Sequence, residues 1–225
     1  MSKYLKYAIG EILLVVVGIL IAFQVNSWNE NRKSKAKEQL YLTSFQNDLV
    51  KNADELQRVI DKTNRVVNMA DTLLKVKNDE VLDFSDRNFT SWIFGSSGFT
   101  IYQAKGGTVK SLIASGDLNV VTNDSLRLAL ATWEDDLSGL KEWEALNKES
   151  SREYQGYVDD NLDLFQVDYI DEPISKTMQE QLLNSRMFLN HVSNRRRLSY
   201  ILNRVYEEQM VQLKALQQRV EEQLQ

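Results

Sequence analysis

Residues 38–76, EQLYLTSFQNDLVKNADELQRVIDKTNRVVNMADTLLKV, place apolar side chains at alternating steps of three and four. This heptad pattern predicts one helix of about 58 Å with a single buried face. Two polar residues, Asn52 and Thr63, lie on that face, where a polar side chain can fix the register of a bundle or of an oligomer. The positions of the buried face are Leu42, Phe45, Leu49, Asn52, Leu56, Val59, Thr63, Val66, Ala70 and Leu73.

The stretch before this helix, KYAIGEILLVVVGILIAFQVNSWNE (residues 6–30), is apolar over about 18 residues, roughly the minimum for a helix that spans a bilayer. It predicts a retained transmembrane helix at residues 8–28, after a stub at 1–7 and before a basic juxtamembrane segment at 29–37. A cleaved signal peptide and a buried core helix are the alternatives. No small-x-small cleavage pattern follows the run and a basic patch comes directly after it, so the retained span is favoured.

Two aromatic residues, Tyr7 and Trp28, bracket the apolar run about 31 Å apart, as expected of anchors at the two membrane interfaces. Glu11 lies one turn inside Tyr7, at a depth where a carboxylate can reach the lipid headgroups. Glu11 also shares a helical stripe with Gly18 and Ala22, small residues that let two helices approach closely. Glu11 is therefore interpreted either as an interfacial acid or as part of a helix-association stripe formed by Glu11, Gly18 and Ala22.

Basic residues lie on both sides of the span, and their positions leave both orientations open. Counting positive charges slightly favours a cytoplasmic bundle, whereas an uncleaved signal anchor with a basic N-terminal stub exports its C-terminal domain. The expected location is a bacterial inner membrane, crossed once. The basic residues are Lys3 and Lys6 before the span and Arg32, Lys33, Lys35 and Lys37 after it.

Residues 78–108, NDEVLDFSDRNFTSWIFGSSGFTIYQAKGGT, interrupt the helical pattern with glycines and serines but hold several aromatic residues. This segment predicts an aromatic-rich loop that caps the end of the bundle remote from the span. The second interpretation is a recognition surface for a partner or a small apolar ligand, formed by Trp92, Phe94 and Phe99.

The remaining sequence predicts further helices that complete a bundle over residues 38–225. A short helix from Thr108 ends at Ser115-Gly116, and the next helix is capped near Thr122 or Asn123. After an acidic, irregular connection, a final helix from Asn184-Ser185 to the C-terminus should pair with the first long helix. Arg195, Arg196 and Arg197 on this helix are interpreted as a solvated face that answers acids of the bundle, in preference to a site for an anionic ligand. The predicted fold is all-α: an N-terminal transmembrane helix and an elongated antiparallel bundle with two long helices.

Composition excludes several classes of function. The net charge of -5 argues against nucleic acid as a partner, because phosphate neutralisation needs a concentrated basic surface. The chain has no cysteine, and its single histidine, His191, has no second metal-ligating residue at the usual spacing. There is no phosphate-binding glycine loop and no nucleophile elbow. We therefore expect no enzyme activity, no catalytic residues, no cofactor and no metal.

Two blocks of the sequence, IGEILLVVVGILIAFQVNSWNENRK (9–33) and SLIASGDLNVVTNDSLRLAL (111–130), resemble an uncharacterised group of single-span proteins found largely in Bacteroidota and grouped as a domain of unknown function. The residues that carry the first match are Gly10-Glu11, Gly18, Gln24, Asn26 and Trp28-Asn29-Glu30. The resemblance implies a membrane-anchored helical protein. It supplies no activity and no functional residues.

These observations predict a membrane-anchored interaction protein that scaffolds or regulates other proteins. Its expected partners are the lipid bilayer and either a protein partner or further copies of the same chain. The alternative is a sensory ligand-binding module that signals through a separate protein, because a tethered bundle of long helices is also typical of receptor input domains.

Overall fold

The computed structural model describes residues 3–81 and 83–225, and the side chains of these residues apart from 3–7, 134 and 136. Across these ranges the chain is helical and has no strand, as the sequence predicts. The elements in chain order are α1 (Lys3–Lys77), α2 (Asp86–Ser96), α3 (Gly107–Ala114), the 3₁₀ helix η1 (Asp117–Val120), α4 (Asp124–Ala131), α5 (Trp133–Asp136), α6 (Ser138–Asn161), the π-helix η2 (Phe165–Tyr169), α7 (Lys176–Asn184) and α8 (Arg186–Leu224).

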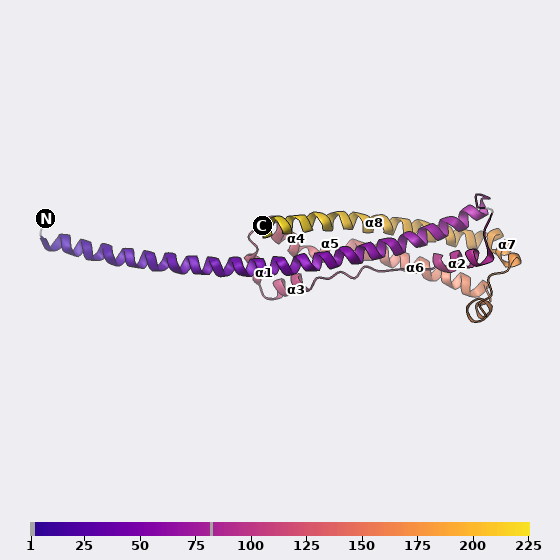
Figure 1. Cartoon of the computed structure of the whole chain (residues 1–225), viewed down its shortest axis with the longest axis horizontal. Helices are drawn as coiled ribbons and strands as arrows, with labels where there is room; N and C mark the ends of the chain where they lie inside the picture. The colour runs from indigo at the N-terminus through magenta and orange to yellow at the C-terminus, as the bar shows by residue number, and fades with distance from the viewer. Residues whose placement is uncertain (1–2, 82) are drawn as a thin grey trace.

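A single helix, α1, runs through 75 residues without interruption. The predicted span, the segment 29–37 and the first bundle helix are therefore one element. Residues 19–77 contain neither glycine nor proline, the two residue types that most disfavour a helix interior. In Figure 1 the first part of α1 extends alone beyond the bundle, and the remainder packs along it.

The bundle is built on the antiparallel pair of α1 and α8, as predicted. Helix α8 has 39 residues and is about 58 Å long, which matches the part of α1 within the bundle. The C-terminus consequently lies beside α1 where the bundle begins (Figure 1). We call this end of the bundle, next to residue 38, the near end, and the opposite end, next to residue 77, the far end.

The heptad face of α1 is buried as predicted. All ten of its positions are buried, and the two polar positions Asn52 and Thr63 are among them. Thr63 donates to the carbonyl of Val59 in its own helix at 2.7 Å, so its hydroxyl needs no partner from another element. Asn52 instead bonds to another segment of the chain, as described below.

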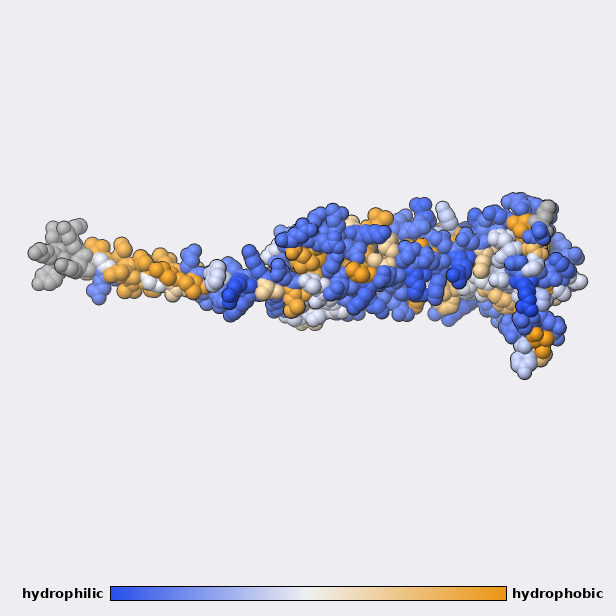
Figure 2. All heavy atoms as spheres, in the orientation of Figure 1, coloured by the Kyte–Doolittle hydropathy of each residue, from blue (hydrophilic) through white to orange (hydrophobic). Residues whose placement is uncertain are grey.

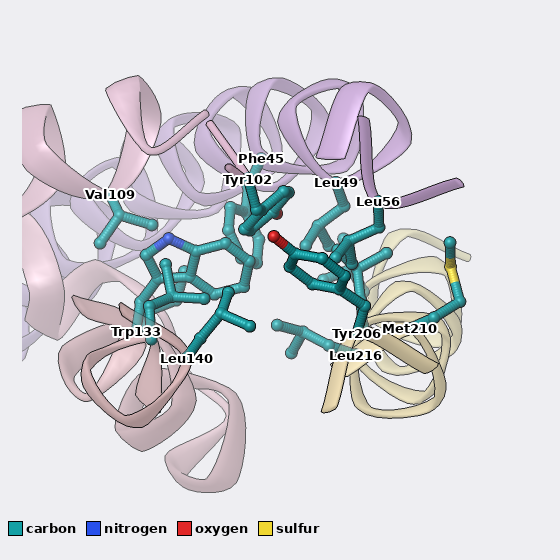
Figure 3. Close-up of a cluster of buried hydrophobic side chains, with 14 of the residues drawn as sticks. Phe45, Leu49, Leu56, Tyr102, Val109, Trp133, Leu140, Tyr206, Met210 and Leu216 are labelled. Carbon is teal, nitrogen blue, oxygen red and sulfur yellow. The ribbon is translucent and has the colours of Figure 1, made fainter. Parts of the chain in front are cut away.

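The buried apolar residues form two clusters. In the near-end cluster, α1 and α8 enclose residues of α3, α4 and α5, and Figure 3 shows Trp133 and Tyr206 entering it from opposite sides. Trp133 packs edge-on against Phe45, with the ring centroids 5.8 Å apart. In the far-end cluster, Phe89, Ile93 and Phe188 are fully buried between α2 and α8.

The segment 78–108, predicted to be a capping loop, contains helix α2 at the far end. Ser85 caps this helix: its hydroxyl accepts from the Asn88 amide, and the Asn88 side chain accepts from the Ser85 amide. This reciprocal cap starts a helix despite the glycines and serines. Burial of Phe89 and Ile93, one turn apart, then holds α2 against α1 and α8.

Residues 97–106 run back from the far end to the near end as an extended segment, and Asn52 of α1 forms two hydrogen bonds with it. The Asn52 side chain donates to the Lys105 carbonyl at 2.8 Å and accepts from the Lys105 amide at 2.6 Å. The segment leads into α3, which ends before Gly116, a residue in the left-handed conformation with φ 73°. Asn123 caps α4, so this predicted stop and start are confirmed.

The helix expected from Asn123 onward is divided at Thr132 and Leu137 into α4, α5 and α6. Leu137 stays in the right-handed helical region, whereas Thr132, with φ -93° and ψ 0°, departs from it. The predicted start of the last helix is confirmed, because the Ser185 hydroxyl accepts from the Phe188 amide and caps α8.

Candidate functional site

The apolar part of α1 lies entirely outside the bundle. It is long and apolar enough to cross a membrane, and none of its most apolar window is buried. Figure 2 shows these side chains as a hydrophobic sleeve on a single helix. Burial of one large apolar side chain away from water is favourable by about 1.5–3 kcal/mol. Exposure of this surface to water is therefore unfavourable, and we expect lipid or another apolar surface to cover it.

The residues of the proposed helix-association stripe are all exposed. Glu11, Gly18 and Ala22 contact no other element, and a methyl group on Gly18 would meet no atom within 4 Å. Trp28 is exposed at the end of the apolar run, with the Arg32 guanidinium 5.5 Å from its ring centroid. The side chain of Tyr7 lies outside the described residues.

Two acidic side chains, those of Asp117 and Glu38, form hydrogen bonds that join the start of the bundle to α1. The Asp117 carboxylate accepts from Lys37 and from Tyr41, each at 2.7 Å. The hydrogen bond from Lys37, followed by that from Tyr41, lowers the pKa of Asp117 to about 2. Glu38 is buried and accepts from the amide and hydroxyl of Thr122. These contacts tie η1 and the start of α4 to the helix that leaves the bundle.

The proposed recognition residues Trp92, Phe94 and Phe99 have unequal exposure. Trp92 and Phe94 are partly buried against the far-end cluster. The ring of Trp92 packs on that of Phe84, with the ring centroids 5.4 Å apart. Phe99 is half exposed on the extended segment, with the Lys148 ammonium 5.7 Å from its ring centroid.

The prediction that Arg195, Arg196 and Arg197 form a solvated face is wrong for Arg195. Arg196, which binds Asp71 at 2.6 Å, is exposed as expected, but Arg195 is fully buried. Its guanidinium donates to the backbone carbonyls of Ser96 (3.0 Å), Asn147 (2.8 Å) and Gly98 (2.6 Å). Burial lowers the pKa of Arg195 to about 10.

The position of Arg195 follows from the periodicity of α8. The buried face of this helix repeats at steps of four and three, and position 195 falls on it. The guanidinium there meets the carbonyls at the C-terminal end of α2, where helix carbonyls lack partners. The signal was therefore present in the sequence. The buried positions concerned are Phe188, Val192, Arg195, Ser199, Leu202 and Tyr206.

A polar layer separates the two apolar clusters halfway along the bundle. It is formed by buried side chains of α1, α6 and α8, and the Asn147 amide donates to the Ser199 hydroxyl at 3.0 Å within it. Its residues are Thr63, Asn147, Ser150, Ser151, Arg195 and Ser199. A cavity of about 210 Å³ borders this layer. Its lining includes Thr63, Asn147 and Ser199 together with Lys62, Arg65 and Phe99.

The far end carries an apolar tip that sequence reasoning missed. Helix η2 projects sideways there (Figure 1), and Phe165 and Tyr169 stack with ring centroids 5.1 Å apart. Phe165 is 58% exposed and Tyr169 78% exposed, and Ile170 adds a further exposed apolar side chain. The region was interpreted as an acidic connection because of its aspartates. A five-residue π-helix has no sequence period that would have indicated it.

A protein family matches residues 11–138 of the chain, which is more than half of its length. The description of this family is "Family of unknown function (DUF6090)". The chain belongs to DUF6090. Neither the comparison with curated proteins nor that with solved structures gave a match.

The DUF6090 region begins inside the apolar segment and ends at the first residue of α6. It contains every proposed site residue except Tyr7. It also contains Lys62, Arg65 and Phe99, the charged and aromatic part of the cavity lining. Asn147, Ser199 and the tip at Phe165 and Tyr169 lie beyond the DUF6090 match.

Proposed function

We propose that this protein is a single-pass membrane protein of a bacterial inner membrane whose helical bundle scaffolds or regulates other proteins and has no catalytic activity. One observation carries the proposal. The helix that is apolar enough to cross a membrane is the same helix that forms the core of the bundle. Such a helix sets the distance and direction of the bundle from the bilayer, as a scaffold requires.

Retention of the apolar segment is supported by the fold and by the family match. Residues 8–28 continue the hydrogen-bonded ladder of α1 into the bundle. The DUF6090 match begins at Glu11, so the apolar segment is part of what this family shares. A cleaved leader would not be expected to form part of a family domain in this way.

The segment 29–37 supplies a short basic stalk between bilayer and bundle. Its nine residues span about 14 Å as a helix. Arg32, Lys33 and Lys35 are exposed there and would be drawn to anionic headgroups, whereas Lys37 is held by Asp117 of the bundle. The stalk thus keeps the near end of the bundle close to the lipid surface on whichever side it lies.

The exposed tip at Phe165, Tyr169 and Ile170 is the surface that we assign to a protein partner. It lies at the far end, about 75 Å along α1 from the end of the apolar run. Exposed aromatic residues are favoured at the centres of protein interfaces. Asp163 and Asp168 flank the tip and are exposed. The fitting partner is a protein with an apolar pocket bordered by basic side chains.

Photo-crosslinking in intact cells tests this assignment. A photoreactive benzoylphenylalanine is placed at Tyr169, and in the control at Tyr200, an exposed tyrosine on α8 away from the tip. We expect one discrete protein adduct from position 169, absent from position 200 and reduced by Asp168→Lys. Identical adducts from both positions, or none from position 169, would count against a partner at the tip.

A sensory ligand-binding module is the second candidate function, and the cavity beside the polar layer favours it. A ligand there would touch α1, α6 and α8 together. The same α1 continues into the apolar segment, so binding in the bundle would act on the helix that enters the bilayer.

A further inference from the structure

The polar layer contains one buried hydrogen-bond donor, the Ser199 hydroxyl, that has no acceptor among the described residues. The Ser199 hydroxyl oxygen accepts a hydrogen bond from the Asn147 side chain. No described residue accepts the hydrogen of the Ser199 hydroxyl. Ser199 is 1% exposed, so this donor is buried at the wall of the cavity. A buried hydroxyl gains from a partner that accepts its hydrogen, because an unmet polar group in the interior is costly.

The charged residues that line the cavity are both cationic. Lys62 and Arg65 lie one turn apart on α1, so their side chains share one face of the helix. Neither forms an ion pair with a described residue, although salt bridges occur elsewhere along α1. Two neighbouring cations repel each other, and an anion between them relieves that repulsion.

A third cation lies behind the cavity wall. The Arg195 guanidinium donates to the carbonyls of Gly98 and Asn147, both of which line the cavity. It has no acidic partner among the described residues. Its charge is buried, where solvent screens it less than at the surface. The cavity therefore lies between exposed and buried positive charge.

The other residues that line the cavity can contact the apolar part of a small organic molecule. Val66 and Phe99 provide apolar wall, and Thr63 and Thr100 provide hydroxyl groups. Gly98 brings the extended segment close to α1: a methyl group there would lie 3.2 Å from the Val66 side chain. A volume of about 210 Å³ equals about seven molecules of liquid water. That space admits a molecule of about ten non-hydrogen atoms or fewer.

We propose that this cavity binds a small organic carboxylate. Its carboxylate group lies between Lys62 and Arg65, its oxygen atoms accept from these cations and from the Ser199 hydroxyl, and its apolar part packs on Val66 and Phe99. The site does not depend on the scaffold function or on the tip. It names the class of ligand that a sensory role of the bundle would require.

Thermal unfolding of the full chain in detergent tests the site. The probes are acetate, succinate and benzoate, each compared with its neutral amide and with sodium chloride at equal ionic strength. At ten times its dissociation constant, a bound ligand should raise Tm by about 3–6 °C. We expect at least one of the three carboxylates to do so and none of the amides.

The double substitution Lys62→Gln with Arg65→Gln removes both cations at exposed, unpaired positions, so the fold should persist. It should abolish the rise in Tm. The control Lys51→Gln removes an exposed lysine of the same helix outside the cavity and should retain the rise. Three results overturn the proposal: no rise with any of the carboxylates, an equal rise with the neutral amides, or a rise that survives the double substitution.

Discussion

Arg195 donates a hydrogen bond of 2.8 Å to the backbone carbonyl of Asn147, and this contact joins α8 to α6 inside the polar layer. The same guanidinium reaches Ser96 and Gly98, so one side chain holds α2, the extended segment and α6. The bundle thus depends on a buried cation that is satisfied by carbonyl oxygens alone.

Removal of this cation should destabilise the bundle strongly. Arg195→Met removes three hydrogen bonds donated by a buried guanidinium, at about 1 kcal/mol or more for each, so it should cost at least about 3 kcal/mol. Thermal unfolding followed by circular dichroism should show a fall in Tm of about 6 °C or more. Arg197→Met is the matched control, because Arg197 is exposed, and it should change stability by less than about 0.5 kcal/mol. Equal effects of the two substitutions would contradict the role given to Arg195.

Asn52 provides a test of the path taken by the extended segment. Asn52→Leu removes both hydrogen bonds to Lys105 and should cost about 1–3 kcal/mol in a denaturant titration. Thr63→Val loses only a bond within its own helix and should cost less. If Asn52 were merely a polar residue in an apolar seam, leucine would instead stabilise the bundle. A rise in stability would therefore show that the segment does not depend on Asn52.

Acid should weaken the contact that joins the near end to the stalk. The pKa of Asp117 is about 2 in the folded chain, below the ordinary 3.8. The ionised carboxylate therefore stabilises the fold above about pH 4, and this contribution is lost as the pH falls toward about 2. Asp117→Asn should lower Tm at neutral pH and reduce the drop in Tm between about pH 5 and about pH 2. The control Asp160→Asn, at an exposed acid of α6, should leave Tm at neutral pH unchanged. An unchanged pH profile in Asp117→Asn would refute the assignment.

Helix association through the stripe of Glu11, Gly18 and Ala22 can be tested with single cysteines, because the chain has none of its own. Ala22→Cys lies on the stripe, and Leu20→Cys lies on the other side of the same helix turn. Mild oxidation in membranes should give a disulfide-linked dimer with Ala22→Cys only. Dimer formation at neither position, or at both equally, would argue against the stripe.

The sequence predicted the two long helices and their buried faces because both follow a sustained heptad period. It also located the stop at Ser115-Gly116, the cap at Thr122 or Asn123 and the start of the last helix at Asn184-Ser185, which depend on local residue chemistry. The continuity of α1 was missed because polar residues at 29–37 suggested a separate segment. The segment contains neither glycine nor proline, the two residue types that disfavour a helix interior most.

The site was less accessible to sequence reasoning than the fold. The polar layer joins residues of α1, α6 and α8 that are far apart in the chain, so no local pattern reveals the cavity. Arg195 was assigned to a solvated face together with its two neighbours, although its place in the period of α8 marked it as buried. The tip at Phe165 and Tyr169 depends on a short π-helix in an acidic stretch, for which no periodicity exists.

The central claim is that one unbroken helix links the bilayer to the bundle. Spin labels at Leu20→Cys and Lys51→Cys, with the full chain in lipid nanodiscs and diluted with unlabelled protein, measure this by pulsed electron resonance. For a continuous helix, 31 residues correspond to about 46 Å, so we predict a single narrow distance distribution near that value. A broad distribution shifted to shorter distances would place a hinge within 29–37 and contradict the account.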